Sequence, residues 1–190
     1  MFAPEGVRIG QCALDILELC AARGRVDEFA AFARDRGMEL PGTGRVVIGT
    51  ERLILCVRPG RWLILTPPTI KISDHVITGW RPAGAALGAA VDLSAGYAAL
   101  LLKGTRSVEV LARGCRLDLD PQVFPQGRAA ATIMAQVPAM LASLPAGMLL
   151  LTPATTARHF TEWLGAAAQA FGLMPQSAIS MADLCRSSMQ

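Results

Sequence analysis

Acid–base and metal chemistry depend first on histidines, and the chain has two of them, His75 and His159. His159 lies beside the apolar stripe of a C-terminal helix, a position more typical of a half-exposed helix residue than of a general base. His75 follows Asp74 and could titrate, but no motif places a nucleophile near it. Neither histidine has a cysteine or carboxylate at the spacing of a metal site. The sequence therefore predicts neither a histidine-based active site nor a metal centre.

Carboxylates and glycine-rich loops are the other groups that could carry chemistry. Asp118 and Asp120 lie two residues apart in a proline-rich stretch, where an extended backbone would point both to one face. Nothing in the sequence indicates a desolvating pocket, so a turn or capping role is favoured. The glycines at 42–44 and 84–88 lack the remainder of a dinucleotide or P-loop motif, and are interpreted as turns and close packing. We expect no catalytic, cofactor-binding or metal-binding residue in this chain.

The composition suggests that part of the exterior is covered by something else. Of 190 residues, 52% are hydrophobic and only 17% charged, and the mean hydropathy is +0.39. The longest uncharged run, 129–157, is interrupted by Pro138, Pro145 and Pro153, which predicts short strands rather than a membrane-spanning helix. The amino terminus lacks a basic stretch followed by an apolar one, so no secretion signal is expected. These features predict a cytoplasmic protein that hides apolar surface against a partner.

The net charge and the cysteine pattern exclude further classes of protein. The net charge is +3 without a cluster of basic residues, and Tyr97 is the only tyrosine, so a nucleic-acid-binding surface is not expected. The five cysteines show no C-x-x-C spacing. Four of them lie among apolar or small residues, which predicts buried free thiols, whereas Cys185 could be exposed.

The first half of the chain shows alternating strand and helix patterns. An apolar stripe with acidic residues in its first turn and basic residues in its last predicts a helix over 25–36. Residues 67–80 suit either a strand or a helix, and 81–90 look like a connection. Strands are predicted at 12–20, 45–48, 53–57 and 62–66.

The second half repeats this outline. A strand pair is expected at 90–93 and 97–103, then a helix over 105–113 with Thr105 as N-cap and Gly114 as its stop. A loop covers 117–127, strands follow at 130–137 and 148–152 with another between them, and a helical stripe runs from Phe160 to Phe171. The sequence predicts an α+β fold of two related strand–helix–strands–helix halves, roughly 8–82 and 90–173. The halves would form a single domain, 1–174, followed by a tail at 175–190.

Large amphipathic side chains are the candidates for contact with a partner, because tryptophan and arginine are favoured interface anchors. Trp163 is assigned to the core by its helical stripe, whereas Trp62 and Trp80 suit core or interface equally. Arg61 and Trp62 are expected at a turn tip, from which a side chain can project. For Arg113 and Asp118, local structure is favoured over an interface. The candidate interface residues are Arg61, Trp62, Trp80, Arg113 and Asp118.

A longer pattern adds a family resemblance. The stretch consists of Val91-Asp92-Leu93-Ser94, Arg113-Gly114-Cys115, Leu117-Asp118-Leu119, Phe124-Pro125, Gly127 and Thr132. Together with Pro59-Gly60-Arg61-Trp62 and Trp163-Leu164, it resembles the gamma subunit of heterotetrameric sarcosine oxidase over roughly 46–164. Arg116 stands where that family usually has proline.

The resemblance implies a structural subunit without a cofactor of its own. In such a complex two larger subunits carry FAD, FMN, NAD and the tetrahydrofolate site, and a small one binds zinc. The complex oxidatively demethylates sarcosine or a related N-methyl amino acid.

The family is in turn similar to the folate-binding aminomethyltransferases of glycine cleavage, which leaves two alternatives. In that wider group acidic residues and a glycine pair serve folate chemistry, whereas the corresponding stretch here, 135–140, has neither. A stand-alone folate-binding or aminomethyltransferase-like protein is therefore the second hypothesis. A generic interaction module in an unrelated assembly is the third.

Overall fold

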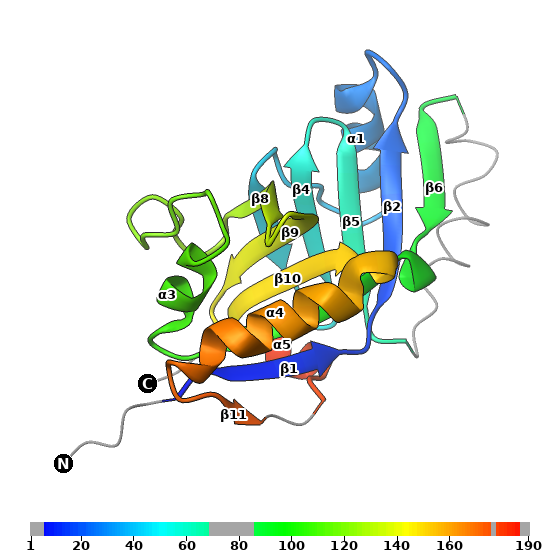
Figure 1. Ribbon diagram of the computed structural model, residues 1–190. Coiled ribbons are helices and arrows are strands. Elements are labelled where there is room, and N and C mark those ends of the chain that lie inside the picture. The colour runs from blue at the N-terminus through cyan, green and yellow to red at the C-terminus, as the bar shows by residue number, and fades with distance from the viewer. Residues whose placement is uncertain (1–5, 69–85, 176–177, 187–190) are drawn as a thin grey trace.

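The computed structural model describes residues 6–68, 86–175 and 178–186, and these form two packed β-sheets with helices outside them (Figure 1). All paired strands are antiparallel except β1 and β11. The six-stranded sheet has the order β11 (Met174–Pro175), β1 (Arg8–Cys12), β7 (Tyr97–Lys103), β10 (Gly147–Pro153), β9 (Val137–Leu144) and β8 (Ala129–Met134). The five-stranded sheet has the order β3 (Arg45–Ile48), β4 (Leu53–Arg58), β5 (Arg61–Thr66), β2 (Asp15–Ala21) and β6 (Gly88–Asp92).

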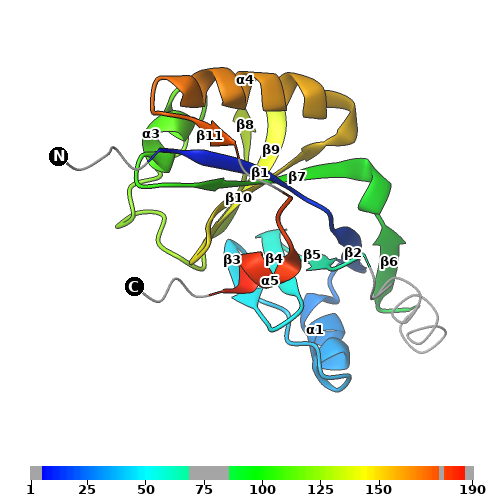
Figure 2. The ribbon, with the colours of Figure 1, turned by 90° about the horizontal axis from the view of Figure 1, so that it is seen from below.

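The fold has four layers, in the order helices, six-stranded sheet, five-stranded sheet and helix, because the strands carry apolar side chains on both faces. The facing sides of the two sheets form the central core, which includes Leu55, Leu65, Leu101 and Leu149. Helices α3 (Ser107–Ala112) and α4 (Ala157–Gln169) cover the outer face of the six-stranded sheet, and α1 (Val26–Arg34) covers the outer face of the other. Figure 2 shows α4 and α1 on opposite sides of the sheet pair. Because the strands are apolar on both faces, each sheet is buried on both sides.

Both predicted amphipathic helices are confirmed. α1 buries Phe29 and Ala33 against its sheet and has Asp27 and Glu28 in its first turn. α4 buries Phe160, Leu164, Ala167 and Ala168. Among the described residues no helix is long and apolar enough to cross a membrane.

The two predicted halves are visible as a repeated strand order. β3-β4-β5-β2 in one sheet matches β8-β9-β10-β7 in the other, and in each half a helix follows the first strand of this set (β2 then α1, β7 then α3). Each sheet is then extended by a strand from the other half: β1 pairs with β7, and β6 pairs with β2. The α+β prediction with related halves is therefore confirmed, but the sheets cross the expected boundary between the halves.

Two strand predictions were wrong because pairing is decided across the fold. The single strand expected at 12–20 is divided at Ala13 and Leu14, so that β1 and β2 belong to different sheets. The expected pair at 90–93 and 97–103 exists as β6 and β7, but these strands also lie in different sheets. Residues 69–85, which include most of the ambiguous segment and Trp80, lie outside the described residues.

The two sheet-to-sheet connections are hydrogen-bonded to each other. Asp92 Oδ1 accepts bonds from the backbone N–H of Ser94 at 2.9 Å and from its hydroxyl at 2.6 Å. The Ser94 hydroxyl accepts the N–H of Ile16 at 3.0 Å, and Leu93 N–H donates to the Ile16 carbonyl at 2.8 Å. The side chains of Asp92 and Ser94 thus tie together the two places where the chain passes from one sheet to the other.

A tight turn between β8 and β9 replaces part of the strand expected at 130–137. Met134 and Val137 pair directly, leaving Ala135 and Gln136 as the turn residues. Both have positive φ, 50° and 66°, which is unusual for residues other than glycine. The Ala135 N–H donates to the Gly114 carbonyl at 3.2 Å, which holds the turn against the loop after α3.

The helix expected at 105–113 is shorter, and its expected cap is absent. α3 begins at Ser107 after Arg106, and no side chain caps its first turn. Gly114 is explained by packing: a Cβ there would lie 2.3 Å from Cζ2 of Trp163. Trp163 packs against the core beneath α4, as predicted, and 117–127 is a loop.

The expected tail at 175–190 is partly built into the core. α5 (Met181–Cys185) begins at a capping box formed by Ser180 and Asp183. Ile179, Met181 and Leu184 are buried between the sheets. The sequence signal was present as Ser180-x-x-Asp183 beside apolar residues. The assignment of 1–174 as one domain stays a prediction.

Candidate functional site

Three of the predicted interface residues, Arg61, Arg113 and Asp118, are exposed in the described part of the chain. Arg61 is the one that lies at the end of a strand with charged neighbours. It begins β5, and its Nη1 donates to Glu18 Oε2 at 3.0 Å, a bond that raises the pKa of Arg61. Arg58 approaches the other oxygen of Glu18 at 3.8 Å. Glu18 is only 14% exposed, whereas the Arg58 side chain is 62% exposed. The structure therefore places a cationic pair around one nearly buried carboxylate, and an interface role for Arg61 stays a prediction.

Trp62 does not project from the turn, contrary to expectation. It is 3% exposed, stacks on Phe29 with ring centroids 5.7 Å apart, and donates from Nε1 to the Pro41 carbonyl at 2.9 Å. Its side chain faces the same side of the sheet as Ile64, two residues along β5. Trp62 anchors α1 to the five-stranded sheet.

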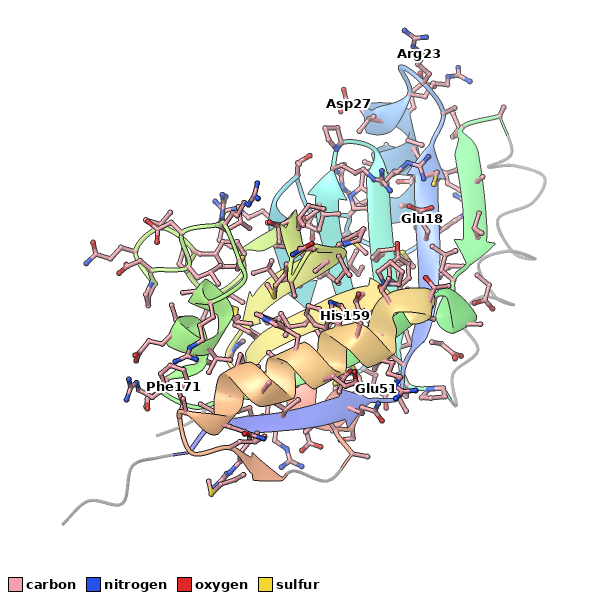
Figure 3. All side chains as sticks on the ribbon, viewed as in Figure 1. Glu18, Arg23, Asp27, Glu51, His159 and Phe171 are labelled. Carbon is pink, nitrogen blue, oxygen red and sulfur yellow. The ribbon has the colours of Figure 1, made fainter. Side chains whose placement is uncertain are left out.

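Arg113 and Asp118 both make contacts within the chain, and an interface role for either stays a prediction. The guanidinium of Arg113 lies 4.8 Å from the ring centroid of Phe171, a residue that follows the end of α4 (Figure 3). Asp118 Oδ1 accepts the N–H of Asp120 at 3.0 Å, as in a turn closed by a side chain. Trp80, the remaining candidate, lies outside the described residues.

Among the described residues, the histidine and the carboxylates considered for chemistry lie apart from one another. His159 is an exposed residue of α4, and its Nε2 lies 3.3 Å from the Ala135 carbonyl (Figure 3). Within the described part of the chain no group of His, Cys, Asp or Glu could hold a metal ion. His75 lies outside that part.

The five cysteines are free, and burial deactivates the thiols of four of them. Burial raises the pKa of Cys12 to about 12 and also raises the pKa of Cys20, Cys56 and Cys185. Of the four thiols predicted to be buried, Cys12 and Cys56 are buried, whereas Cys20 and Cys115 are half-buried. Cys185, considered as a possible exposed thiol, is half-buried with its sulfur 3.6 Å from that of Met181. A raised pKa leaves little thiolate at neutral pH, so these side chains are poor nucleophiles.

Sequence reasoning missed a groove at the open edge of the central core, which we call the inter-sheet groove. It has a volume of about 190 Å³. Val57 and Arg58 of β4 lie on one side, and Tyr97, Pro138, Met140 and Pro153 contribute from the six-stranded sheet. The signal that could have revealed it is the second apolar face of the β8–β9 hairpin, because Val137 and Ala139 alternate with Pro138 and Met140.

Comparison with known proteins shows where this fold is used. The sequence model of the family described as "Sarcosine oxidase, gamma subunit family" matches residues 23–170, most of the chain. The chain belongs to the sarcosine oxidase gamma subunit family. A sarcosine oxidase subunit gamma from Corynebacterium sp. (strain P-1) is 29% identical over 150 residues, covering 77% of this chain and 72% of the relative. The subunit gamma from Arthrobacter sp. is 31% identical over 114 residues, covering 59% and 55%.

Solved structures agree with this family. A chain of the heterotetrameric sarcosine oxidase from Corynebacterium sp. U-96, in complex with pyrrole 2-carboxylate, matches with a TM-score of 0.74 and 26% identity. The match covers 90% of this chain and 88% of that one. Aminomethyltransferase T of the glycine cleavage system from Bartonella henselae matches with a TM-score of 0.63 and 13% identity, covering 95% of this chain and 50% of that one. The second likeness shows the shared fold.

The residues that resemble other gamma subunits have structural partners in this chain. Asp92 and Ser94 tie the sheet-to-sheet connections, and Gly114 admits Trp163. Phe124 is 7% exposed, and Gly127, with φ of 84°, donates its N–H to the Ser143 carbonyl at 2.8 Å. The residues of the family pattern named here therefore stabilise the fold of this chain.

Proposed function

We propose that this gamma-subunit family member is a non-catalytic, structural component of a heterotetrameric amine-oxidising complex. The observation that carries the proposal is the match of nearly the whole fold to a chain of heterotetrameric sarcosine oxidase. The use of family residues for contacts within the scaffold supports it.

The finer parts of the proposal rest on the resemblance. Larger subunits carry FAD, FMN, NAD and tetrahydrofolate, a small subunit holds zinc, and this chain holds none of them. The assembly oxidatively demethylates sarcosine or a related N-methyl amino acid. We place the complex in the cytoplasm, in line with the composition of this chain.

A stand-alone folate-binding protein remains the competing function. The stretch that would serve folate chemistry, 135–140, forms the β8–β9 turn and the start of β9, and it contains no carboxylate. A folate amine needs a proton donor or acceptor near it, and this stretch supplies only Gln136 as a polar side chain. Calorimetric titration of the isolated chain with tetrahydrofolate tests this function, and saturable heat would favour it over the subunit role.

Native mass spectrometry and an absorbance scan test the subunit role directly. The chain is co-expressed with the larger oxidase subunits of its own source and purified through a tag on this chain. We expect a large assembly with flavin absorbance. A colourless species at 20.1 kDa, the mass of the chain alone, would contradict the proposal.

A further inference from the structure

The inner face of the β8–β9 hairpin continues beyond the edge of the central core. Ala129 and Ala142 are buried on this face, 2% and 0% exposed, because the five-stranded sheet packs over them. Further along the hairpin the same face presents Pro138 opposite Ile133, which is 50% exposed. The opposite face of the hairpin packs against the helices and is better covered, with Met134 0% and Ala139 3% exposed. An apolar layer thus extends out of the core without cover from the described segments.

The hairpin is held in place from its buried side. Ala135 and Gln136 both have positive φ, a conformation that costs free energy for residues with a side chain. The Gly114 carbonyl accepts the Ala135 N–H, and His159 lies against the Ala135 carbonyl. Such restraints present the exposed face at a fixed position, as a preorganised binding surface requires.

The inter-sheet groove beside this face has the size of a pocket for one side chain. Its volume of about 190 Å³ is comparable with the roughly 150 Å³ cavity that holds a benzene ring. It is smaller than the roughly 300–1,000 Å³ of typical small-molecule sites. An aromatic or aliphatic side chain from another protein therefore fits it better than a free ligand does.

The positive charge of Arg58 at the edge of the groove indicates that an acidic residue lies next to the inserted side chain. Arg58 is the charged residue that lines the groove in the described part of the chain. Its nearest carboxylate, Glu18, is already bonded to Arg61 at 3.0 Å, while Arg58 lies 3.8 Å away. A guanidinium has five N–H donors, so Arg58 retains capacity for a carboxylate from outside. A second copy of this chain would bring another Arg58 to the same face, which disfavours symmetric pairing.

We propose that the inter-sheet groove receives an apolar anchor side chain flanked by an acidic residue from a larger subunit of the complex. The inference rests on the proposed function and names the contact surface. The anchor packs against Met140 and Pro138 in the groove, and the acidic residue pairs with Arg58. Ile133, opposite Pro138 on the same face, extends the apolar contact beyond the groove.

Affinity between this chain and the larger subunits tests the proposal. Ile133→Lys places a charge on the apolar face, and Arg58→Glu reverses the rim charge. We expect each to raise the dissociation constant at least about tenfold, and the salt dependence of binding to weaken in Arg58→Glu. Ile133 is 50% exposed, so Ile133→Lys should leave the melting temperature of the free chain unchanged. Arg58→Glu also removes the ion pair with Glu18, so Arg58→Gln, which adds no carboxylate beside Glu18, is measured with it and should weaken binding in the same direction.

Two matched substitutions serve as controls. Val123→Lys introduces the same charge at a residue that is 56% exposed, in the loop whose Phe124 packs against the outer face of the six-stranded sheet. Arg23→Glu reverses a charge at the far tip of the turn after β2 (Figure 3). Both should change the dissociation constant less than about twofold.

The outcomes separate this proposal from the subunit role. If the wild-type chain assembles and the groove variants bind equally well, the groove is not the contact and only this inference fails. A homodimer that Ile133→Lys disrupts would also overturn it, since the occupant would be a second copy. If the wild-type chain does not assemble with the larger subunits, the proposed function fails together with this inference.

Discussion

The contact between Gly114 and Trp163 leaves no room for a side chain at position 114. An added Cβ would lie 2.3 Å from the indole ring, and the ring is fixed between α4 and the loop after α3. Gly165, in the middle of α4, has nothing within 4 Å of an added Cβ. Replacement by alanine should therefore have opposite effects on stability at the two positions.

We expect Gly114→Ala to lower the free energy of unfolding by about 1–3 kcal/mol, because the tryptophan must move from its packed position. Gly165→Ala should raise it by roughly 0.5–1 kcal/mol, because alanine favours a helix. Urea denaturation followed by tryptophan fluorescence measures both. A neutral Gly114→Ala would show that Trp163 can relax at little cost.

Trp62 illustrates what residue type alone could not decide. The sequence placed it after a Pro-Gly turn, which suits an exposed anchor and a buried strand residue equally. Its burial depends on Phe29 of α1 and the carbonyl of Pro41, both more than 20 residues earlier in the chain. Only the packing of α1 on the sheet brings these groups together.

At the scale of elements, α5 shows how a short helix is stabilised by its cap. The Ser180 hydroxyl accepts the Asp183 N–H, and Asp183 Oδ2 accepts the Ser180 N–H at 3.0 Å and its hydroxyl at 2.6 Å. Hydrogen bonds from Ser180 lower the pKa of Asp183 in the folded chain. The carboxylate therefore contributes stability above its unfolded pKa of about 3.9, and this contribution is lost as the pH falls through the lower folded value.

We expect Asp183→Asn to destabilise the chain at pH 7, and the difference from the wild type to disappear as the pH falls through the folded pKa of Asp183. Ser180→Ala should cost about 0.5–2 kcal/mol at pH 7, the usual range for loss of an N-cap. Denaturant titrations at pH 7 and at several acidic values measure both variants. A constant difference between Asp183→Asn and the wild type across this range would contradict the role of the carboxylate.

Helices and strands with a clear period were predictable, whereas their ends and partners were not. α1, α4 and the strands β3 to β5 follow local patterns of apolar residues. α3 begins two residues later than expected, because Thr105 does not cap it. The β8–β9 turn escaped prediction because Ala135 and Gln136 lack the residue types that favour positive φ.

At the scale of the whole molecule, the carboxyl-terminal segment helps to close the central core. Leu184 is fully buried and belongs to the cluster formed by both sheets. Ile179 forms a bridge with Cys12, at the end of β1. The carboxyl-terminal segment thus contacts the connection between β1 and β2, where the chain passes from one sheet to the other.

We expect Leu184→Ala to lower the free energy of unfolding by about 2–5 kcal/mol in one cooperative transition, since it opens a cavity in the shared core. Met174→Ala serves as the control, because Met174 is 36% exposed and should cost less than about 0.5 kcal/mol. Differential scanning calorimetry and urea denaturation test both. A loss no larger than that of Met174→Ala would mean that α5 detaches without affecting the core.

The sequence by itself determined the alternating elements, the α+β class with related halves, and the family. These depend on neighbouring residues or on a pattern that can be read along the chain. Tertiary structure decided that β1 and β6 join the sheet of the other half, that Trp62 is buried and that the carboxyl-terminal segment enters the core. It also placed Arg58 beside the apolar face of the β8–β9 hairpin. The physical reason is that the spacing of apolar residues along the chain indicates which side chains are buried. The element that buries them is decided by contacts between residues far apart in sequence.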